Sequence, residues 1–263
     1  MMNLLIKKWP SLLLTAILPS FVKRQLFALS YHLVSLEHKV VILNMVSLSW
    51  SLEKIKSLGF EPRAIIDVGA YVGEWTRSIR HIFPDARFLM VEAQPKKMAH
   101  LENVKRMDPG RLLIKNCLLG PETKSAVPFF EMDTGSSVLE ENSCQPREKI
   151  FLDMTTLDSL LSEFNLQGPL LLKLDVQGFE LEVLRGSRIA LDAAEFVLLE
   201  VSTLNYNRGA PLVAEVLDFM NQRGFVLFDI ADLGRKSNDQ VLFQMDVLFA
   251  KKDSKIRTAI NHF

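Results

Sequence analysis

The hydrophobic pattern of the chain changes close to residue 60. Before it, apolar residues recur at intervals of three or four, as in the series Leu48, Leu52, Ile55 and Leu58. This spacing predicts helices, and Gly59 is a typical helix terminator. After it, short apolar runs alternate with helix-like segments. Such alternation predicts a mostly parallel sheet that is covered by helices on both faces.

The predicted elements can be placed by residue range. The expected strands are 64–66, 87–91, 112–119, 126–132, 170–174, 196–201, 225–230 and 244–250. The expected helices are 74–83, 96–107, 154–164, 178–185 and 211–223, with Thr155 or Thr156 as a cap of the third. The last two strands read as a hairpin that adds an antiparallel edge. Residues 133–146 are polar and rich in turn formers, which indicates a binding loop or lid.

Composition indicates a globular chain with an uneven charge distribution. The 263 residues are 48% apolar and 24% charged, enough for one large α/β domain plus an appendage. The formal net charge is +0, which gives no support for nucleic-acid binding. Residues 1–60 are nevertheless basic, with seven lysines and arginines against two glutamates. We therefore divide the chain into an N-terminal helical segment (1–55), a catalytic domain (56–252) and a C-terminal tail (253–263).

The N-terminal segment allows several interpretations. The apolar run 11–18 lies between Pro10 and Pro19 and is too short for a membrane span, which needs about 20 apolar residues. A helical lid on the body is favoured, ahead of a membrane-surface segment over residues 1–30 and a signal peptide. Cys117 and Cys144 lack metal-site spacing and read as free thiols. A cytoplasmic protein, with membrane association as the alternative, is expected; the oligomeric state is left open.

A glycine turn follows the first strand of the predicted sheet. Asp67, Gly69 and Gly73 stand between a buried strand and a helix start, an arrangement that brings backbone close to a nucleotide-like ligand. The spacing D-x-G-x-x-x-G differs from the G-x-G-x-x-G of dinucleotide folds. It favours a ligand with a cationic or hydroxyl-bearing part, such as S-adenosylmethionine.

Acidic residues stand at the ends of four predicted strands: Asp67, Glu92, Asp175 and Glu200. Ligands of open parallel sheets bind beyond the carboxyl ends of the strands. Glu92, 25 residues after Asp67, is placed to accept hydrogen bonds from the two hydroxyls of a ribose. Glu92 alone indicates an adenosine, and the glycine spacing favours the methyl donor over a nicotinamide.

Four segments resemble the FkbM family of class I, S-adenosylmethionine-dependent methyltransferases. They are Ile66–Gly73, Val91–Pro95, Thr156–Asp158 and above all Leu172–Gly186, which reads K-x-D-V-x-G-x-E-x-x-V-L-x-G from Lys173. The resemblance covers roughly residues 55–252. It implies a Rossmann-like three-layer methyltransferase fold: a mostly parallel seven-stranded sheet with an antiparallel last strand, plus N-terminal helices. It also implies transfer of a methyl group to a hydroxyl on a small molecule, sugar or glycan.

The resemblance also implies a set of site residues. The cofactor would be held by Asp67, Gly69, Ala70, Tyr71, Gly73 and Thr76 at its methionine end, by Glu92 and Ala93 at the ribose, by Glu122 at the adenine, and by Ser137 and Asp175. Asp175 is the first candidate for a general base, followed by Glu180 and Glu200. Lys173, on a buried strand, should pair with a carboxylate, either for shape or for catalysis. No metal is expected; a divalent ion on Asp175 and Glu200 is the minor alternative.

Four positions depart from the family pattern. Tyr71 and Gln94 stand where Asn is usual, Pro121 follows Gly120 where Asp is common, and Gln177 replaces a usual Glu. These departures motivate one alternative, a module that binds the cofactor without transferring a methyl group. The other alternative is a nicotinamide-dependent oxidoreductase, against which the glycine spacing speaks.

Overall fold

A computed structural model describes residues 47–142, 146–236 and 238–260. The predictions for residues 1–46 and for Cys144 lie outside these ranges. The described residues belong to one compact unit that begins at Val46. Within them, no helix combines the length and the apolar character that a membrane crossing requires.

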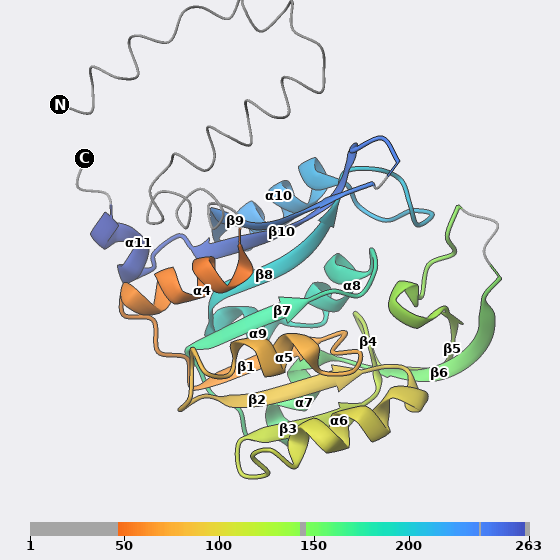
Figure 1. Cartoon of the computed structure of the whole chain (residues 1–263), viewed down its shortest axis with the longest axis horizontal. Helices are drawn as coiled ribbons and strands as arrows, with labels where there is room; N and C mark the ends of the chain where they lie inside the picture. The colour runs from red at the N-terminus through yellow and green to blue at the C-terminus, as the bar shows by residue number, and fades with distance from the viewer. Residues whose placement is uncertain (1–46, 143–145, 237, 261–263) are drawn as a thin grey trace, which may run out of the picture. The chain divides into compact units, whose positions relative to one another are not determined.

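A seven-stranded sheet forms the centre of this unit, and it confirms the expected fold (Figure 1). Its strands, in spatial order, are β3 (Leu112–Asn116), β2 (Arg87–Glu92), β1 (Ala64–Val68), β7 (Leu170–Leu174), β8 (Ala194–Ser202), β10 (Leu242–Lys251) and β9 (Phe225–Arg235). The first five are parallel, and β10 runs antiparallel to both of its neighbours. The predicted closing hairpin is therefore also confirmed. The order reverses between β1 and β7, the position at which parallel sheets bind ligands.

Helices cover both faces of the sheet. One face carries α4 (Leu48–Ser57), α5 (Glu74–Ile79) and α6 (Met98–Lys105), whose buried residues share a core cluster with strand residues such as Ile65 and Met90. The other face carries α7 (Leu157–Glu163), α8 (Glu180–Arg185), α9 (Arg188–Ala193) and α10 (Val213–Gln222), which pack on residues such as Ile66 and Leu172. A short helix, α11 (Lys255–Ile260), follows β10. Because Ile65 and Ile66 alternate between the two clusters, every residue of β1 is buried.

A second, three-stranded sheet was predicted only in part, because its strand over 126–132 was expected and its other two strands were not. It contains β4 (Leu118–Leu119), β6 (Glu148–Thr155) and β5 (Lys124–Glu131) in that order. The single strand expected over 112–119 was wrong, because the chain leaves the main sheet at Cys117. Asn116 is the last residue of β3, and its side-chain amide donates to the carbonyl oxygens of Glu92 (2.7 Å) and Ala93 (3.1 Å) at this point. The small sheet lies beyond the carboxyl ends of β1 and β2 (Figure 1).

The remaining helix predictions hold with changed bounds. The helix expected over 154–164 begins only at Leu157, because Glu148–Thr155 forms β6. Thr156 caps it by accepting a hydrogen bond from the Ser159 amide (3.2 Å). The helix expected over 96–107 is divided into η3 (Pro95–Lys97) and α6.

Gly69 sets the distance between the β1 turn and the end of β7. Its φ is +76°, and a Cβ at this position would collide with the carbonyl oxygen of Asp175. Glycine is therefore required here by both the backbone angle and the close approach.

Replacing Gly69 by alanine should lower the free energy of unfolding by about 3 kcal/mol or more, since a collision adds to the backbone strain. Gly59→Ala is the matched control: φ there is +96° with no atom within 4 Å of an added Cβ, so strain alone should cost about 1–2 kcal/mol. Urea unfolding of both variants measures the difference. Equal losses in the two variants would show that the approach of Asp175 has no energetic weight.

Candidate functional site

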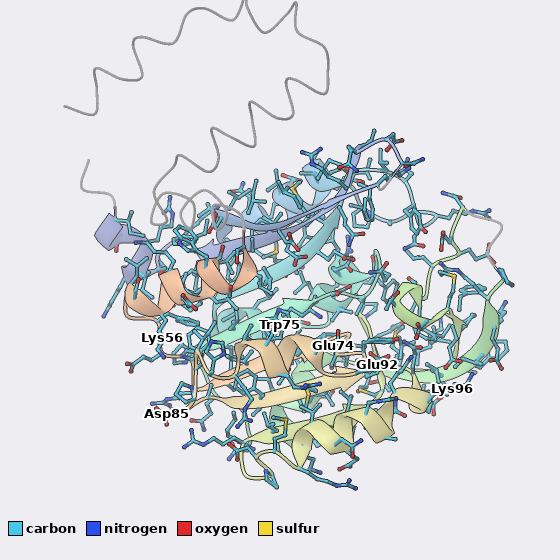
Figure 2. All side chains as sticks on the ribbon, viewed as in Figure 1. Lys56, Glu74, Trp75, Asp85, Glu92 and Lys96 are labelled. Carbon is cyan, nitrogen blue, oxygen red and sulfur yellow. The ribbon has the colours of Figure 1, made fainter. Side chains whose placement is uncertain are left out.

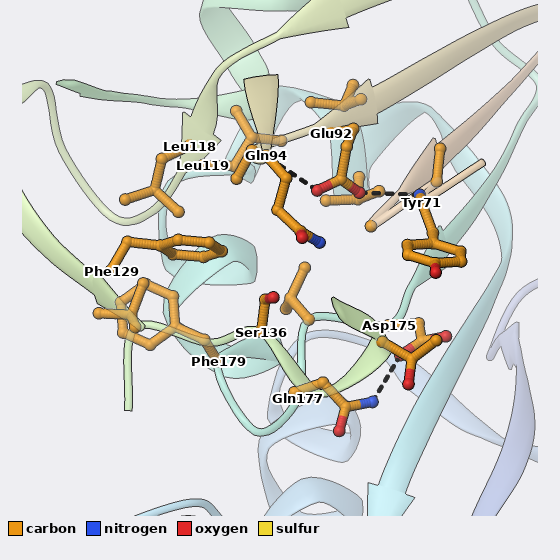
Figure 3. A pocket seen from close by; sticks show the side chains of 18 of the residues that line it. Tyr71, Glu92, Gln94, Leu118, Leu119, Phe129, Ser136, Asp175, Gln177 and Phe179 are labelled. Carbon is orange, nitrogen blue, oxygen red and sulfur yellow. Dashed lines mark hydrogen bonds between the residues drawn. The ribbon is translucent and has the colours of Figure 1, made fainter. Parts of the chain in front are cut away.

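A cavity of about 220 Å³ lies where β1, β2 and β7 end, beside the small sheet. Its walls come from the turns after β1 and β7, the end of β2, the β3–β4 junction and the 133–138 segment. Figure 3 shows Glu92 at one side of it, Asp175 and Gln177 at another, and Leu118, Phe129 and Phe179 at a third. The cavity thus has polar and apolar parts that are spatially separated.

A buried ion pair lies beneath the cavity. The ammonium of Lys173 is 3.0 Å from Asp67 Oδ1 and 3.6 Å from Asp175 Oδ2, and it donates to the Gly69 carbonyl oxygen (3.2 Å). Thr76 donates its hydroxyl proton to the other oxygen of Asp67 (2.8 Å). Burial by itself lowers the pKa of Lys173, but Asp67 and Asp175 outweigh this and raise it above its ordinary value. The predicted pairing of Lys173 with a carboxylate is confirmed.

Glu92 holds the two turns that border the adenosine side of the predicted site. Its carboxyl oxygens accept hydrogen bonds from the backbone N–H groups of Tyr71 and Gln94, each at 2.8 Å (Figure 3). Burial raises the pKa of Glu92, while these two hydrogen bonds act in the opposite direction. Each carboxyl oxygen has a second lone pair, so Glu92 can still accept from hydroxyl groups in the cavity.

Tyr71 is backbone-strained and joins the β1 turn to the 133–136 segment. Its φ is +51°, which is uncommon for an aromatic residue. Its hydroxyl donates to Asp133 Oδ1 at 2.5 Å, and Lys97 contacts the same oxygen at 2.5 Å while lying 4.1 Å from the centre of the Tyr71 ring. Gln94 adds a hydrogen bond to the Asp133 carbonyl (3.1 Å). Side chains from the β1 turn, Gln94 and η3 therefore hold Asp133, the first residue of the predicted lid segment, at the wall of the cavity.

Lys96 of η3 forms ion pairs with two strands of the small sheet. Its ammonium is 2.6 Å from Glu131 on β5 and 2.9 Å from Glu148 on β6. Figure 2 shows Lys96 beside these strands, beyond Glu92 at the end of β2. Lys96 thus connects η3 to the second sheet, whereas its neighbour Lys97 contacts Asp133 in the segment that follows β5.

Asp175 and Gln177 form the wall opposite Glu92. The Asp175 side chain is 36% exposed, and its Oδ1 accepts a hydrogen bond from Gln177 Nε2 (3.0 Å) (Figure 3). The same amide nitrogen donates to Glu200 Oε2 (2.7 Å), and Gln244 donates to the other oxygen of Glu200. Asp175 is therefore the carboxyl group of this wall that both lines the cavity and remains partly accessible.

Glu180 caps the turn that carries Asp175 and Gln177. Its Oε1 accepts hydrogen bonds from the N–H groups of Val176 (2.9 Å) and Gly178 (3.1 Å). Burial raises its pKa to about 7, against the effect of these hydrogen bonds. Glu180 is 3% exposed and does not line the cavity, so its contacts are those of a structural cap.

Burial and mutual repulsion raise the pKa values of two more acids near this wall. The pKa of Glu200 rises to about 10, first through burial and then through Asp175, Glu180 and Asp246. Burial raises the pKa of Asp246 to about 6, with Asp175 adding to the effect and Lys173 opposing it. The surroundings of Glu200 therefore disfavour its charged form, and Glu200 does not line the cavity.

The structure brings together about half of the predicted site residues. Those that line the cavity are Gly69, Ala70, Tyr71, Glu92, Ala93, Lys173 and Asp175. Those that do not are Asp67, Gly73, Thr76, Glu122, Ser137, Glu180 and Glu200.

The predicted residues outside the lining differ in their surroundings. Asp67 and Thr76 are 0% exposed and bond to each other, and Ser137 donates to the Gln177 carbonyl (2.9 Å). Glu122 is exposed on the turn before β5, so the structure gives no support for its contact with an adenine.

Several lining residues were not predicted. The apolar ones are Cys117, Leu118, Leu119, Phe129, Val138 and Phe179; the polar ones are Glu74, Gln94, Asp133, Ser136 and Gln177. The sequence did single out Gln94 and Gln177, because each departs from the family pattern within a segment that resembles the family. The thiol of Cys117 is part of the apolar wall, and burial raises its pKa to about 12.

The arrangement fits the predicted cofactor. Apolar side chains such as Leu119 and Phe179 suit a purine ring, and Glu92 suits the paired hydroxyls of a ribose. The opposite wall carries Asp175, which suits a neighbouring cation. Among the described residues no group of three or more His, Cys, Asp and Glu side chains has a geometry that could hold a metal ion.

Comparisons with known proteins agree with the sequence motifs. The model of the methyltransferase FkbM domain matches residues 67–227. A protein of Beauveria bassiana (strain ARSEF 2860) described as methyltransferase 1 is 28% identical over 142 residues, which is 46% of this chain and 57% of that protein. The chain thus aligns with little more than half the length of this curated relative.

Solved structures show weaker likeness. The crystal structure of an FkbM methyltransferase from Methylobacillus flagellatus KT has a TM-score of 0.45 at 17% identity, over 70% of this chain and 43% of that one. A precorrin-6y C5,15-methyltransferase from Geobacter metallireducens GS-15 has a TM-score of 0.43 at 10% identity, over 77% and 85%. The family assignment rests on the domain match.

Asp246→Asn should stabilise the protein in a pH-dependent manner. The folded pKa of about 6 exceeds the ordinary value of 3.8, so the contribution of Asp246 to stability is full below pH 3.8 and is lost as the pH rises through 6. The variant should therefore gain about 1–2 kcal/mol at pH 8 and nothing at pH 3.5. Urea unfolding at both pH values, with exposed Asp253→Asn as control, measures this. A gain that is equal at both pH values would contradict it.

Proposed function

The chain belongs to the FkbM family of S-adenosylmethionine-dependent methyltransferases, and we propose that it methylates a hydroxyl oxygen of a small molecule, sugar or glycan. The observation that supports a hydroxyl acceptor is the position of Asp175. It presents a partly exposed carboxyl group to the cavity, on the wall opposite Glu92. A hydroxyl must lose its proton as its oxygen gains a carbon, and a carboxyl group within reach assists that loss.

The residues that would hold the cofactor divide along the cavity. Glu92 would accept the ribose hydroxyls, with Leu118, Leu119 and Phe129 around the base, and Gly69, Ala70 and Tyr71 along the methionine end. The bound cofactor supplies an electrophilic methyl group on a positively charged sulfur. The acidic wall at Asp175 and the rigid turn at Gly69 would orient this end toward an acceptor.

The lid segment supplies a means of excluding water. Asp133, Thr134 and Ser136 line the cavity, and Asp133 is held by Tyr71 and Lys97. A closed wall at this side keeps solvent from competing with the acceptor for the methyl group.

Asp175→Asn should separate chemistry from cofactor binding. The amide keeps the size of the side chain but cannot accept a proton at neutral pH, so turnover should fall about 100-fold. Affinity for S-adenosylhomocysteine, measured by calorimetry, should stay within about twofold because the ribose site is untouched. Unchanged turnover would show that another group removes the proton.

Glu92→Ala should give the opposite pattern. The loss of two hydrogen bonds to the ribose should weaken both S-adenosylhomocysteine and 5′-methylthioadenosine about tenfold or more, since both carry the ribose. Equal binding of these two probes to wild type and variant would remove Glu92 from the ribose site. Circular dichroism of the variant checks that the turns held by Glu92 remain folded.

The acceptor class is tested by incubating the chain with radiolabelled cofactor and a fractionated cell extract. Methyl ethers resist mild alkali, whereas methyl esters are hydrolysed. We expect label in an alkali-stable product that requires Asp175. Label that alkali releases would contradict a hydroxyl acceptor and indicate a carboxyl one.

A further inference from the structure

The side chain of Gln177 contacts two acids of the wall to which it belongs. Its side-chain amide donates to Asp175 Oδ1 (3.0 Å) and to Glu200 Oε2 (2.7 Å). Both partners are carboxyl oxygens, so the nitrogen end of the amide must face them, and the two protons of that nitrogen suffice for the two hydrogen bonds. Gln177 therefore connects the cavity-lining carboxyl group to the half-buried one on β8.

The backbone of Gln177 is fixed as firmly as its side chain. Its φ is +55°, and that of Gly178 is +94°, so two successive left-handed residues turn the chain back toward the strand ends. Its carbonyl oxygen accepts hydrogen bonds from Ser137 Oγ (2.9 Å) and Asn207 Nδ2 (2.7 Å), both of which belong to buried residues. Ser137 of the predicted lid segment and Asn207, which follows β8, thus hold the carbonyl group of Gln177. This fixes the backbone from which the Gln177 side chain extends.

The surroundings explain why an amide suits this position. Charged or titratable groups surround the two carboxyls that Gln177 joins: Lys173 on β7, Glu180 on α8 and Asp246 on β10 act on them directly, while Asp67 on β1 acts on Lys173 and Asp232 on β9 acts on Asp246. One of them, Lys173, is a cation, and its ammonium already contacts Asp67 and the Gly69 carbonyl. A third carboxyl group between Asp175 and Glu200 would add negative charge that no further cation of this set offsets.

We propose that Gln177 is a positioning residue, which orients the Asp175 carboxyl group toward the acceptor through its amide bridge to Glu200. This inference rests on the proposed function, since it assigns the bridge a part in proton removal. An amide keeps its two protons at every pH at which the protein is folded, so the bridge persists while the acids around it titrate. A glutamate at this position would donate a hydrogen bond only when protonated.

The test uses three variants of the full chain. Gln177→Met keeps the length of the side chain and removes its donors, and Gln177→Glu keeps its shape and adds an acid. Gln222→Met is the matched control, because the Gln222 amide also donates to a carboxyl group, that of Asp218 (2.7 Å), but on the exposed face of α10.

The first readout needs no acceptor. In ¹H–¹⁵N spectra, the side-chain amide signals of Gln177 are identified by their loss in Gln177→Met. We expect Asp175→Asn to shift these signals strongly, and the control variant to leave them unchanged. Signals at the positions of a free, exposed amide that do not respond to Asp175→Asn would overturn the proposal, whatever the reaction of the protein is.

The second readout is kinetic, with the acceptor recovered from the labelled extract. Gln177→Met should lower kcat about tenfold and leave the affinity for S-adenosylhomocysteine within about twofold. Gln177→Glu should in addition move the acidic limb of the kcat profile to higher pH, because the new acid opposes ionisation of Asp175. Unchanged kcat and pH profile in both variants would overturn the positioning role.

Failure of the proposed methyl transfer and failure of the Gln177 bridge can be distinguished. If the wild-type chain binds no S-adenosylhomocysteine while the Gln177 signals respond to Asp175→Asn, the proposed function fails and the bridge exists without it. If the chain binds and transfers but the signals do not respond, the function stands and the bridge is wrong.

Discussion

The buried ammonium of Lys173 is the constraint on which the site depends. A lysine on a central strand is stable only if each of its protons finds an acceptor. Here the three groups in reach are Asp67, the Gly69 carbonyl and Asp175, which belong to β1, to the turn after it and to the end of β7. One cation therefore fixes the separation of the two turns that border the cavity. Breaking such a pair costs about 3–5 kcal/mol, because the remaining charge stays buried.

This arrangement divides the acids near the cavity into distinct roles. Asp67 is fully buried and balances Lys173, and Glu180 caps the turn that carries Gln177. Burial and acidic neighbours raise the pKa of Glu200, whose two oxygens accept hydrogen bonds from two side-chain amides. Of the acids at the four strand ends, Glu92 and Asp175 line the cavity. Under the proposed function, the acids at the four strand ends would be one ribose-side group, one reactive group and a supporting set, rather than four equivalent ligands.

The sequence predicted the main sheet and the ends of its strands because these depend on local pattern. A strand, the turn at Gly69 and the strand end at Glu92 can each be recognised from a few neighbouring residues. Strand β6 of the small sheet was missed although Ile150, Leu152 and Met154 alternate as in a strand, because the helix cap at Thr156 follows directly and its signal was extended backwards. Asn116, which ends β3, gave no local signal, since its partners are carbonyl groups of another strand.

Contacts between distant segments were the least predictable part of the site. The hydrogen bond of Tyr71 to Asp133 joins positions 62 residues apart, and the bridge from Gln177 to Glu200 depends on two left-handed residues and a neighbouring strand. Both residues were visible as departures from a family pattern, but their function follows only from the geometry. Glu122 is the opposite case, a residue singled out from the sequence that the geometry does not support. Its position after Gly120 and Pro121 suggested a contact with the adenine, but its side chain is exposed.

The proposed division of the cavity can be tested by a crystal structure of the full chain with S-adenosylhomocysteine. We expect both ribose hydroxyls to donate to Glu92, the purine to lie against Leu118 and Phe129, and the sulfur to lie on the side of Asp175 and Gln177. A nucleoside bound in the reverse orientation, with its base at Asp175, or bound outside this cavity, would contradict it.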